Sequence, residues 1–231
     1  MNIALICEGV SESKILNYFI ERLGGDDITI NPIQPKLKEV HGKIQQAEHG
    51  GWSQVIAHCN DKTIMDAFET NDLLVIQIDT DACYQSAFGL SILGENNQVK
   101  NDECLYTDIC THLSKGLSSE IYEKYKDKII FAICFNEIEC WLLPFLTTNT
   151  KLCNATNNCI HKVNDLLKSK GLGIPEKDKN CQMAINAYRT ILKSAKKKKD
   201  IENASKFSFR ICNQLLLNIL CVISQKCVID L

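Results

Sequence analysis

The chain has 231 residues, of which 45% are hydrophobic and 23% are charged. This composition is typical of a folded protein with one sizeable core, or a core with a small appendage, and not of a disordered chain. The formal net charge of −2 and the isoelectric point near 6.2 exclude a general electrostatic attraction to nucleic acids or membranes. Any such partner would have to be bound by a local patch.

The first predicted element is a short strand at residues 3–7. This apolar run is too short for a signal peptide, and it has no basic flank before it and no small-residue cleavage site after it. No apolar stretch approaches the roughly 20 residues that a membrane helix needs. We therefore expect a cytoplasmic protein with no membrane partner.

An amphipathic helix is predicted next, with Ser11 as its N-cap and with the glycine pair at residues 24–25 as its end. Residues 28–30 form a second, short strand, which Pro32 places near a sheet edge. A polar loop is expected to follow this strand.

The central part of the sequence continues the alternation of helices and strands. A helix is predicted over about residues 52–68, a buried strand over 73–78, and a loop with a short helix over 84–101. A helix over 102–124 and a fourth apolar strand over 129–135 follow. Strands that alternate with helices indicate a parallel α/β sheet with right-handed crossovers.

The last part of the sequence is predicted to be helical. A helix begins at residues 136–143 with acidic residues near its positive end, and the rest is mostly helical, with a polar loop at 171–180. The predicted architecture is a Rossmann-like, mostly parallel sheet flanked by helices in residues 1–145, on which a helical C-terminal region, 146–231, packs.

Thirteen cysteines are present, and several lie inside apolar runs: Cys7, Cys134, Cys140, Cys212 and Cys221. An odd number of cysteines without an export signal argues against a disulfide framework. We therefore interpret most of them as buried thiols.

The nearest approach to a zinc pattern is the set Cys153, Cys159 and His161. It lacks a CxxC knuckle and a partner pair of the right form, so an ordinary loop is the favoured interpretation.

Acidic residues follow three of the four predicted strands. Glu8 follows the first, Asp79 and Asp81 follow the third, and Glu137 and Glu139 follow the fourth. The carboxyl ends of parallel strands meet at one edge of the sheet, where ligands bind. The sequence therefore predicts a cluster of carboxylates at that edge.

Carboxylates at close quarters raise one another's pKa values unless a cation offsets their charge. Oxygen ligands, without histidine or cysteine at matching places, favour Mg²⁺ or Mn²⁺ over zinc. Such an ion binds phosphate oxygens and stabilises the charge that develops in phosphoryl transfer. One or two ions of this kind are expected.

Three segments together resemble the Toprim domain, which topoisomerases, primases and OLD-type nucleases share. ICEGVSE at residues 6–12 looks like the glutamate motif, and DTD at 79–81, after a hydrophobic strand, looks like the DxD motif. FNEIECWLLP at 135–144 is similar to a helix of Toprim proteins from restriction and phage-defence loci, such as the RloB-like families, and Ser-Phe-Arg at 208–210 resembles them weakly. The resemblance covers roughly the first 145 residues, a usual domain size.

The resemblance implies roles for five residues. Glu8 matches a general acid or base, or a metal ligand, and Asp79 and Asp81 match the DxD metal ligands. Glu12 and Glu139 match acids that could hold a second ion. The chain departs from the topoisomerase pattern because it lacks an evident tyrosine-bearing cleavage domain.

Structural interpretations of the same residues remain open at this point. Asp79 and Asp81 could cap a strand-to-loop turn, and Glu12 could serve only the helix macrodipole. Glu137 and Glu139 are two apart, so on a helix they point to different faces, and the resemblance selects Glu139.

Basic residues near the C-terminus could grip the phosphates of a nucleic acid: Lys196, Lys197, Lys198, Lys199 and Arg210. A solvated face of the protein explains such a short run equally well.

The expected function is that of a Mg²⁺-dependent Toprim nuclease that hydrolyses DNA or RNA, as an effector of a bacterial anti-phage system. The sequence has no GxxxxGK[ST] loop, so an ATPase would have to be a partner protein. A non-catalytic Toprim-fold assembly subunit is the alternative from another class. A haloacid-dehalogenase-like phosphatase is disfavoured because it expects DxD on the first strand. The oligomeric state is left open, with a homo-oligomer among the alternatives.

Overall fold

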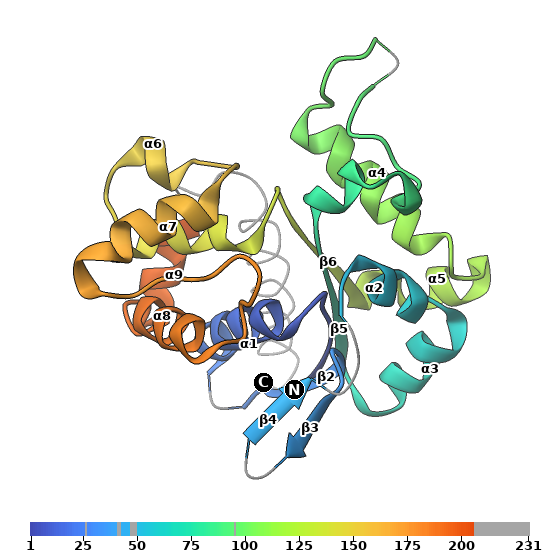
Figure 1. Cartoon of the computed structure of the whole chain (residues 1–231). Helices are drawn as coiled ribbons and strands as arrows, with labels where there is room; N and C mark the ends of the chain where they lie inside the picture. Colours follow the sequence, from blue (N-terminus) through green and yellow to red (C-terminus); the bar gives the residue numbers. More distant parts are fainter. Residues whose placement is uncertain (26, 41–42, 47–49, 95, 206–231) are drawn as a thin grey trace. The chain divides into compact units, whose positions relative to one another are not determined.

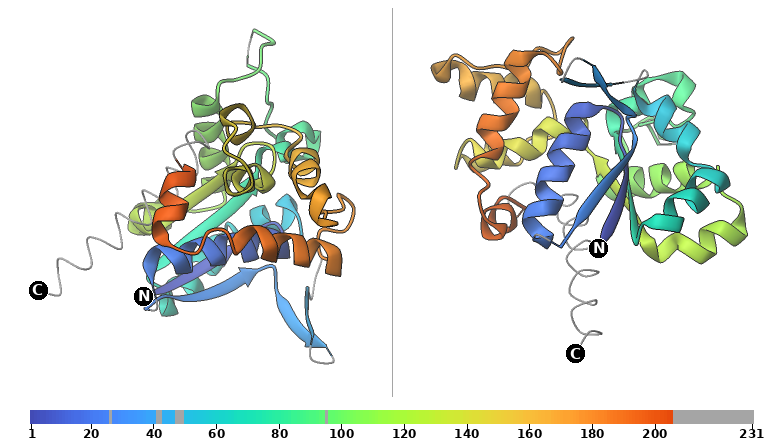
Figure 2. Two further views of the ribbon diagram at one scale, coloured as in Figure 1. Left: turned by 90° about the vertical axis from the view of Figure 1, so that its left-hand side faces the viewer. Right: turned by 90° about the horizontal axis from the view of Figure 1, so that it is seen from below.

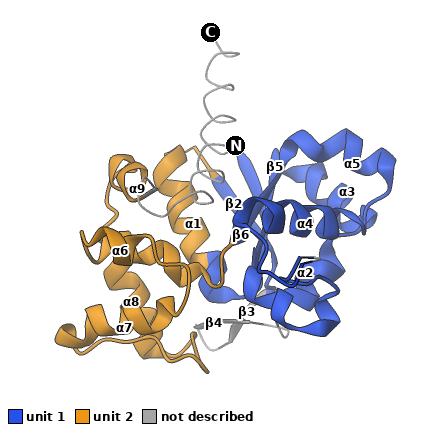
Figure 3. Cartoon of the chain, turned by 90° about the horizontal axis from the view of Figure 1, so that it is seen from above, with its two compact units in different colours: residues 1–13, 29–133 blue, residues 14–28, 134–231 orange. Residues whose placement is uncertain are grey.

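The computed structural model describes residues 1–25, 27–40, 43–46, 50–94 and 96–205. The chain divides into two compact units: unit 1 comprises Met1–Ser13 and Thr29–Ile133, and unit 2 comprises Lys14–Ile28 and Cys134–Leu231 (Figure 3). Helix α1 (Val10–Gly24) begins in unit 1 and continues into unit 2. The expected boundary at residue 145, between a sheet domain and a helical C-terminal region, stays a prediction.

A four-stranded, all-parallel sheet is the centre of unit 1, as the alternation of helices and strands predicted. Its strand order is β2 (Thr29–Gln34), β1 (Asn2–Ile6), β5 (Leu73–Asp79) and β6 (Ile129–Cys134). In the register of β1 and β5, Ile3 pairs with Leu73 and Ile6 with Ile76. The carboxyl ends of these two strands therefore lie side by side.

Four helices of unit 1 gather on one face of this sheet (Figures 1 and 2). They are α2 (Trp52–His58), α3 (Asp61–Thr70), α4 (Asp102–Ser114) and α5 (Ser119–Tyr125). All seven residues of β5 are buried. This burial explains the nearly continuous apolar sequence of the strand, which is typical of a central parallel strand.

The single helix predicted over residues 52–68 is wrong, because the structure has α2 and α3 in its place. Asn60 separates them: its side chain accepts a hydrogen bond from the backbone N–H of Thr63 and so caps α3. The helix predicted over 102–124 is likewise divided. Ser118 caps α5. Just before it, the chain passes so close to Cys59 that a Cβ on Gly116 would lie 1.9 Å from the carbonyl oxygen of Cys59 and would clash with it.

The other elements of unit 1 either differ from expectation or are short connections. The expected polar loop after β2 contains an antiparallel hairpin, β3 (Leu37–Val40) and β4 (Lys43–Gln46). Helix α1 begins at Val10, so Ser11 lies inside its first turn and is not the N-cap. Short 3₁₀ helices are η1 (Thr80–Tyr84), η2 (Ser86–Phe88) and η3 (Lys126–Lys128).

Unit 2 is helical in its described part, as predicted for the C-terminal region. After α1 it contains η4 (Ile138–Phe145), α6 (Thr150–Cys153), α7 (Cys159–Leu167), η5 (Lys168–Lys170), α8 (Gln182–Leu192) and α9 (Lys198–Ser205). The segment expected as an α-helix start is the 3₁₀ helix η4. It contains Pro144, whose ring and missing N–H disfavour an α-helix. No helix among the described residues is long and apolar enough to cross a membrane.

One cysteine prediction is wrong. Cys140 is not a buried thiol, because it forms a disulfide with Cys159 inside unit 2. The apolar sequence around Cys140 predicted its burial correctly, but it held no information about a partner 19 residues away. Cys7 and Cys134 are free and buried as expected, whereas Cys212 and Cys221 lie outside the described residues.

Candidate metal centre

Three carboxylates converge at the carboxyl edge of the sheet in unit 1. Glu8 comes two residues after β1, Asp79 ends β5, and Asp81 lies in η1. One oxygen atom from each lies within 4.8 Å of the others. The three oxygens come from segments 71 residues apart in sequence, brought together by the pairing of β1 with β5.

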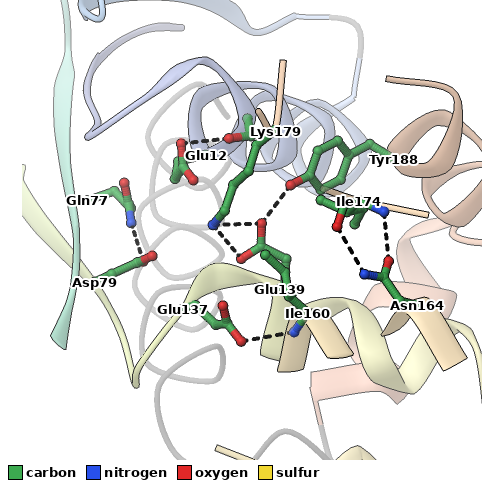
Figure 4. A network of polar contacts seen from close by, with 11 residues as sticks. Glu12, Gln77, Asp79, Glu137, Glu139, Ile160, Asn164, Ile174, Lys179 and Tyr188 are labelled. Atoms are coloured by element: carbon green, nitrogen blue, oxygen red, sulfur yellow. Dashed lines mark hydrogen bonds and ion pairs between the residues drawn. The ribbon is translucent and has the colours of Figure 1, made fainter. Parts of the chain in front are cut away.

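Hydrogen bonds join the ends of the two strands. Oε1 of Glu8 accepts the backbone N–H of Asp79 at 2.6 Å. The side chain of Gln77 accepts the backbone N–H of Glu8 at 3.2 Å and donates to Oδ1 of Asp79 at 2.7 Å. Figure 4 shows the second of these contacts of Gln77. The carboxylates of Glu8 and Asp79 are therefore held in place by hydrogen bonds.

The exposure of the three carboxylates increases along the cluster. Asp79 is buried, with 6% of its surface exposed, Glu8 is half-buried and Asp81 is exposed. Burial of a carboxylate is costly unless hydrogen bonds or a cation compensate for lost hydration. An ion bound here would be held from inside by Asp79 and would be reached from solvent on the side of Asp81.

The neighbouring thiol of Cys7 responds to this negative charge. Burial raises the pKa of Cys7 well above its usual value, and the charges of Glu12, Glu8 and Asp79 raise it further. The thiol therefore stays protonated at neutral pH and adds no further charge. A group of oxygen ligands without a nitrogen or thiolate ligand fits a hard cation such as Mg²⁺ or Mn²⁺.

Glu12 shares this environment but is held by other partners. Its side chain is buried in the first turn of α1, and Oγ of Ser11 donates to Oε2 at 2.9 Å. A Cβ on Gly9 would lie 2.6 Å from the same oxygen. Gly9 therefore leaves the space that the Glu12 carboxylate occupies, a role that the sequence did not reveal. A direct part of Glu12 in metal binding stays a prediction.

Glu139 lies in unit 2, inside a buried polar network (Figure 4). Its side chain is fully buried. Tyr188 donates its hydroxyl hydrogen to Oε1 at 2.6 Å, and Nζ of Lys179 lies 3.0 Å from each carboxylate oxygen. Neither partner could be recognised from the sequence, because both come from the polar loop and helix that follow more than 35 residues later. The proposed role of Glu139 toward a second ion stays a prediction.

Glu137 has a different structural task. Its Oε1 accepts the backbone N–H of Ile160 at 2.9 Å, in the first turn of α7. The residue before this helix, Asn158, makes no side-chain cap. Glu137 therefore supplies the acceptor that the N-terminus of α7 needs, in agreement with the preference for acidic groups at this end of a helix.

A ligand atom of Glu137 and the two sulfur atoms of Cys140 and Cys159 also lie within 4.8 Å of one another. The sulfur atoms are bonded to each other, so neither is the thiolate that a metal would bind. Nε2 of His161 lies 3.0 Å from Oε1 of Glu176. Cys159 and His161 therefore each have a partner within unit 2.

The basic residues expected to bind nucleic acid are described in part. Lys196 to Lys199 are exposed, and they lead into α9, where the backbone N–H of Lys197 donates to Asp200 at 2.8 Å. Arg210 lies outside the described residues. The exposure of the four lysines is compatible with nucleic-acid binding and equally with a solvated face of the protein.

No family model matches the chain, and no match was found among curated proteins or solved structures.

Proposed function

We propose that this protein is a Mg²⁺- or Mn²⁺-dependent nuclease that hydrolyses phosphodiester bonds of DNA or RNA. The observation that carries the proposal is the convergence of Glu8, Asp79 and Asp81 within 4.8 Å at the carboxyl edge of a parallel sheet. Glu8 and the two aspartates would hold one ion, and Glu12 and Glu139 are the candidates for a second. A bound ion supplies charge stabilisation at the phosphate and a more acidic water.

The protein's own side chains have distinguishable parts in this proposal. Asp79, buried and hydrogen-bonded, provides the fixed side of the site. Asp81, exposed, would hold the ion on its solvent side, where the ion could be reached by a phosphate group. Glu8 is half-buried, and the resemblance assigns it either a ligand role or proton transfer as a general acid or base.

The biological setting is part of the same proposal. The similarity of ICEGVSE, DTD and FNEIECWLLP to Toprim proteins of defence loci supports an effector of a bacterial anti-phage system, acting in the cytoplasm with an ATPase partner. The sequence contains no GxxxxGK[ST] phosphate loop, so nucleotide regulation would come from that partner.

The decisive experiment compares wild type with Asp79→Ala for Mg²⁺-dependent cleavage of plasmid DNA and tRNA, alone and with the product of the neighbouring gene. Asp127→Ala is the matched control, because Asp127 is an exposed carboxylate that precedes β6 and so lies toward the opposite edge of the sheet. We expect cleavage by wild type and by Asp127→Ala, and none by Asp79→Ala. If wild type cleaves neither substrate, the non-catalytic assembly subunit is favoured. If Asp79→Ala cleaves as well as wild type, the carboxylate cluster is not the site of cleavage.

The lysines before and within α9 are proposed to bind the nucleic-acid backbone. Replacing Lys196 to Lys199 by glutamine should weaken binding and reduce the dependence of log K on log salt, by about 0.7 for each lost contact with a single strand. Replacing the same four residues by arginine should preserve both the affinity and its dependence on salt. Equal salt dependence in the glutamine variant would show that the run is only a solvated face.

A further inference from the structure

Gln77 is a polar side chain inside a strand that is buried throughout. It is 0% exposed, and its neighbours along β5, Ile76 and Ile78, are buried and apolar. Burial of an amide costs free energy unless all of its polar atoms find partners. A leucine or isoleucine would fill this buried position without the cost of burying polar atoms, so the presence of an amide needs a specific explanation.

Both ends of this amide serve the carboxylate cluster. Because side chains alternate along a strand, Gln77 and Asp79 lie on the same face of β5. The amide N–H₂ donates to Oδ1 of Asp79 at 2.7 Å, and the amide oxygen accepts the backbone N–H of Glu8 at 3.2 Å. The direction of the amide is determined by its partners, since a carboxylate needs a donor and a backbone N–H needs an acceptor.

We propose that Gln77 is a positioning residue of the metal centre, which sets the affinity for the ion without touching it. The inference rests on the proposed function, because it concerns the same site. By holding Oδ1 of Asp79, Gln77 fixes the rotation of that carboxylate, and by holding the N–H of Glu8 it fixes the end of β1 beside it. Residues that orient metal ligands by hydrogen bonds typically change metal affinity 10- to 100-fold when they are replaced.

The chemistry of this position favours an uncharged residue with both a donor and an acceptor. A lysine or arginine would donate to Asp79 but would place a positive charge against the cation. A glutamate would accept from Glu8 but would offer Asp79 no donor at neutral pH. Glutamine provides both the donor and the acceptor, and because it is uncharged it leaves the negative charge of the carboxylates to be offset by the ion.

The test measures binding of Mg²⁺ alone to the full chain by titration calorimetry. Gln77→Met keeps the length and loses both hydrogen bonds, and we expect its dissociation constant to rise 10- to 100-fold. Ile78→Val is the matched control, because it perturbs the same buried strand on the opposite face. It should leave the dissociation constant within about twofold. The electron paramagnetic resonance spectrum of bound Mn²⁺ should change in Gln77→Met and should stay the same in Ile78→Val.

A folding defect is separated from a positioning effect by melting curves recorded without metal. If Gln77→Met fails to fold, Gln77→Asn retains an amide that is too short to reach both partners, and it should show the same loss of affinity in a folded protein. Wild-type affinity in a folded Gln77 variant, or an equal loss in Ile78→Val, would overturn the inference alone. Failure of the wild-type protein to bind Mg²⁺ would overturn the metal centre and the inference together.

Discussion

Glu8 and Asp79, at the ends of two neighbouring parallel strands, are joined by a 2.6 Å hydrogen bond from the backbone N–H of Asp79 to Oε1 of Glu8. The Glu8 side chain therefore has two separable properties. Its oxygen completes the hydrogen bonding of a partly buried backbone group, and its charge contributes to the carboxylate cluster.

Substitutions of Glu8 should separate these properties. Glu8→Gln keeps an oxygen that can accept from Asp79, so its free energy of unfolding should stay close to that of wild type, while Mg²⁺ affinity and cleavage fall. Glu8→Ala also removes the acceptor and should lose a further 1–3 kcal/mol or so of stability. Urea unfolding and Mg²⁺ titration of both variants provide the check. Equal stability of the two variants would show that the hydrogen bond contributes little.

The buried network in unit 2 gives a second prediction. Tyr188→Phe removes the hydroxyl that donates to Oε1 of Glu139 at 2.6 Å, so a fully buried carboxylate loses one partner. We expect the free energy of unfolding to fall by about 1.5–3 kcal/mol, the range for hydrogen bonds to charged groups. Tyr84→Phe, at a tyrosine that is 66% exposed, is the control and should change little. An unchanged urea midpoint in Tyr188→Phe would contradict the assigned contact.

The thiol of Cys59 predicts a loss of stability in alkali. Burial raises the pKa of Cys59 from 9.0 to about 12, so the folded protein keeps this proton while the unfolded chain releases it. The stabilisation is complete below pH 9 and should be lost, at about 1.4 kcal/mol per pH unit, as the pH rises from 9 toward 12.

Burial also raises the pKa values of Cys7, Cys83 and Cys110, so Cys59→Ala should reduce the alkaline slope by the share of one thiol without abolishing it, as urea unfolding at pH 8 and pH 10 would measure. Val55→Ala, a truncation of another buried residue in the same region, should lower stability at both pH values and leave the slope unchanged. If Cys59→Ala retains the wild-type slope, another group is responsible for it.

The disulfide between Cys140 and Cys159 predicts sensitivity of unit 2 to reductant. A cross-link that closes a loop of this length stabilises a folded chain by about 3 kcal/mol through the entropy of the unfolded state. Dithiothreitol should therefore lower the melting temperature of wild type, and it should have no effect on Cys140→Ala/Cys159→Ala. Cys104→Ser, at an exposed free cysteine, should remain as sensitive as wild type. A wild-type melting temperature that does not respond to reductant would contradict the prediction.

The parallel sheet and the acidic cluster were accessible from the sequence because both follow from one rule. Apolar runs that alternate with helices form a parallel sheet, and the carboxyl ends of its strands share an edge. Glu8 and Asp79 follow their strands so closely that pairing of the strands suffices to bring them together. Placing Asp81 needed only the short turn that follows.

Most features that the sequence did not reveal depend on partners distant in the chain, but one is local. The cap at Asn60 is a local signal that the apolar periodicity across it concealed. The pairing of Cys140 with Cys159, and the contact of Tyr188 with Glu139, require knowledge of the packing in unit 2. Gln77 is a polar residue within the apolar run at residues 73–78, but the sequence does not show its two hydrogen-bond partners.

The separation of Glu8 from Asp79 along the chain has a consequence for the order of folding. The two groups are 71 positions apart in the sequence, and the β1–β5 pairing that unites them closes a long loop. Such non-local contacts form slowly because the entropy of loop closure must be overcome first. A nascent chain that ends before Leu73 carries Glu8 without either aspartate. The three carboxylates therefore come together only after β5 and the turn that follows it have been synthesised and β5 has paired with β1, so a shorter nascent chain would lack the proposed metal site.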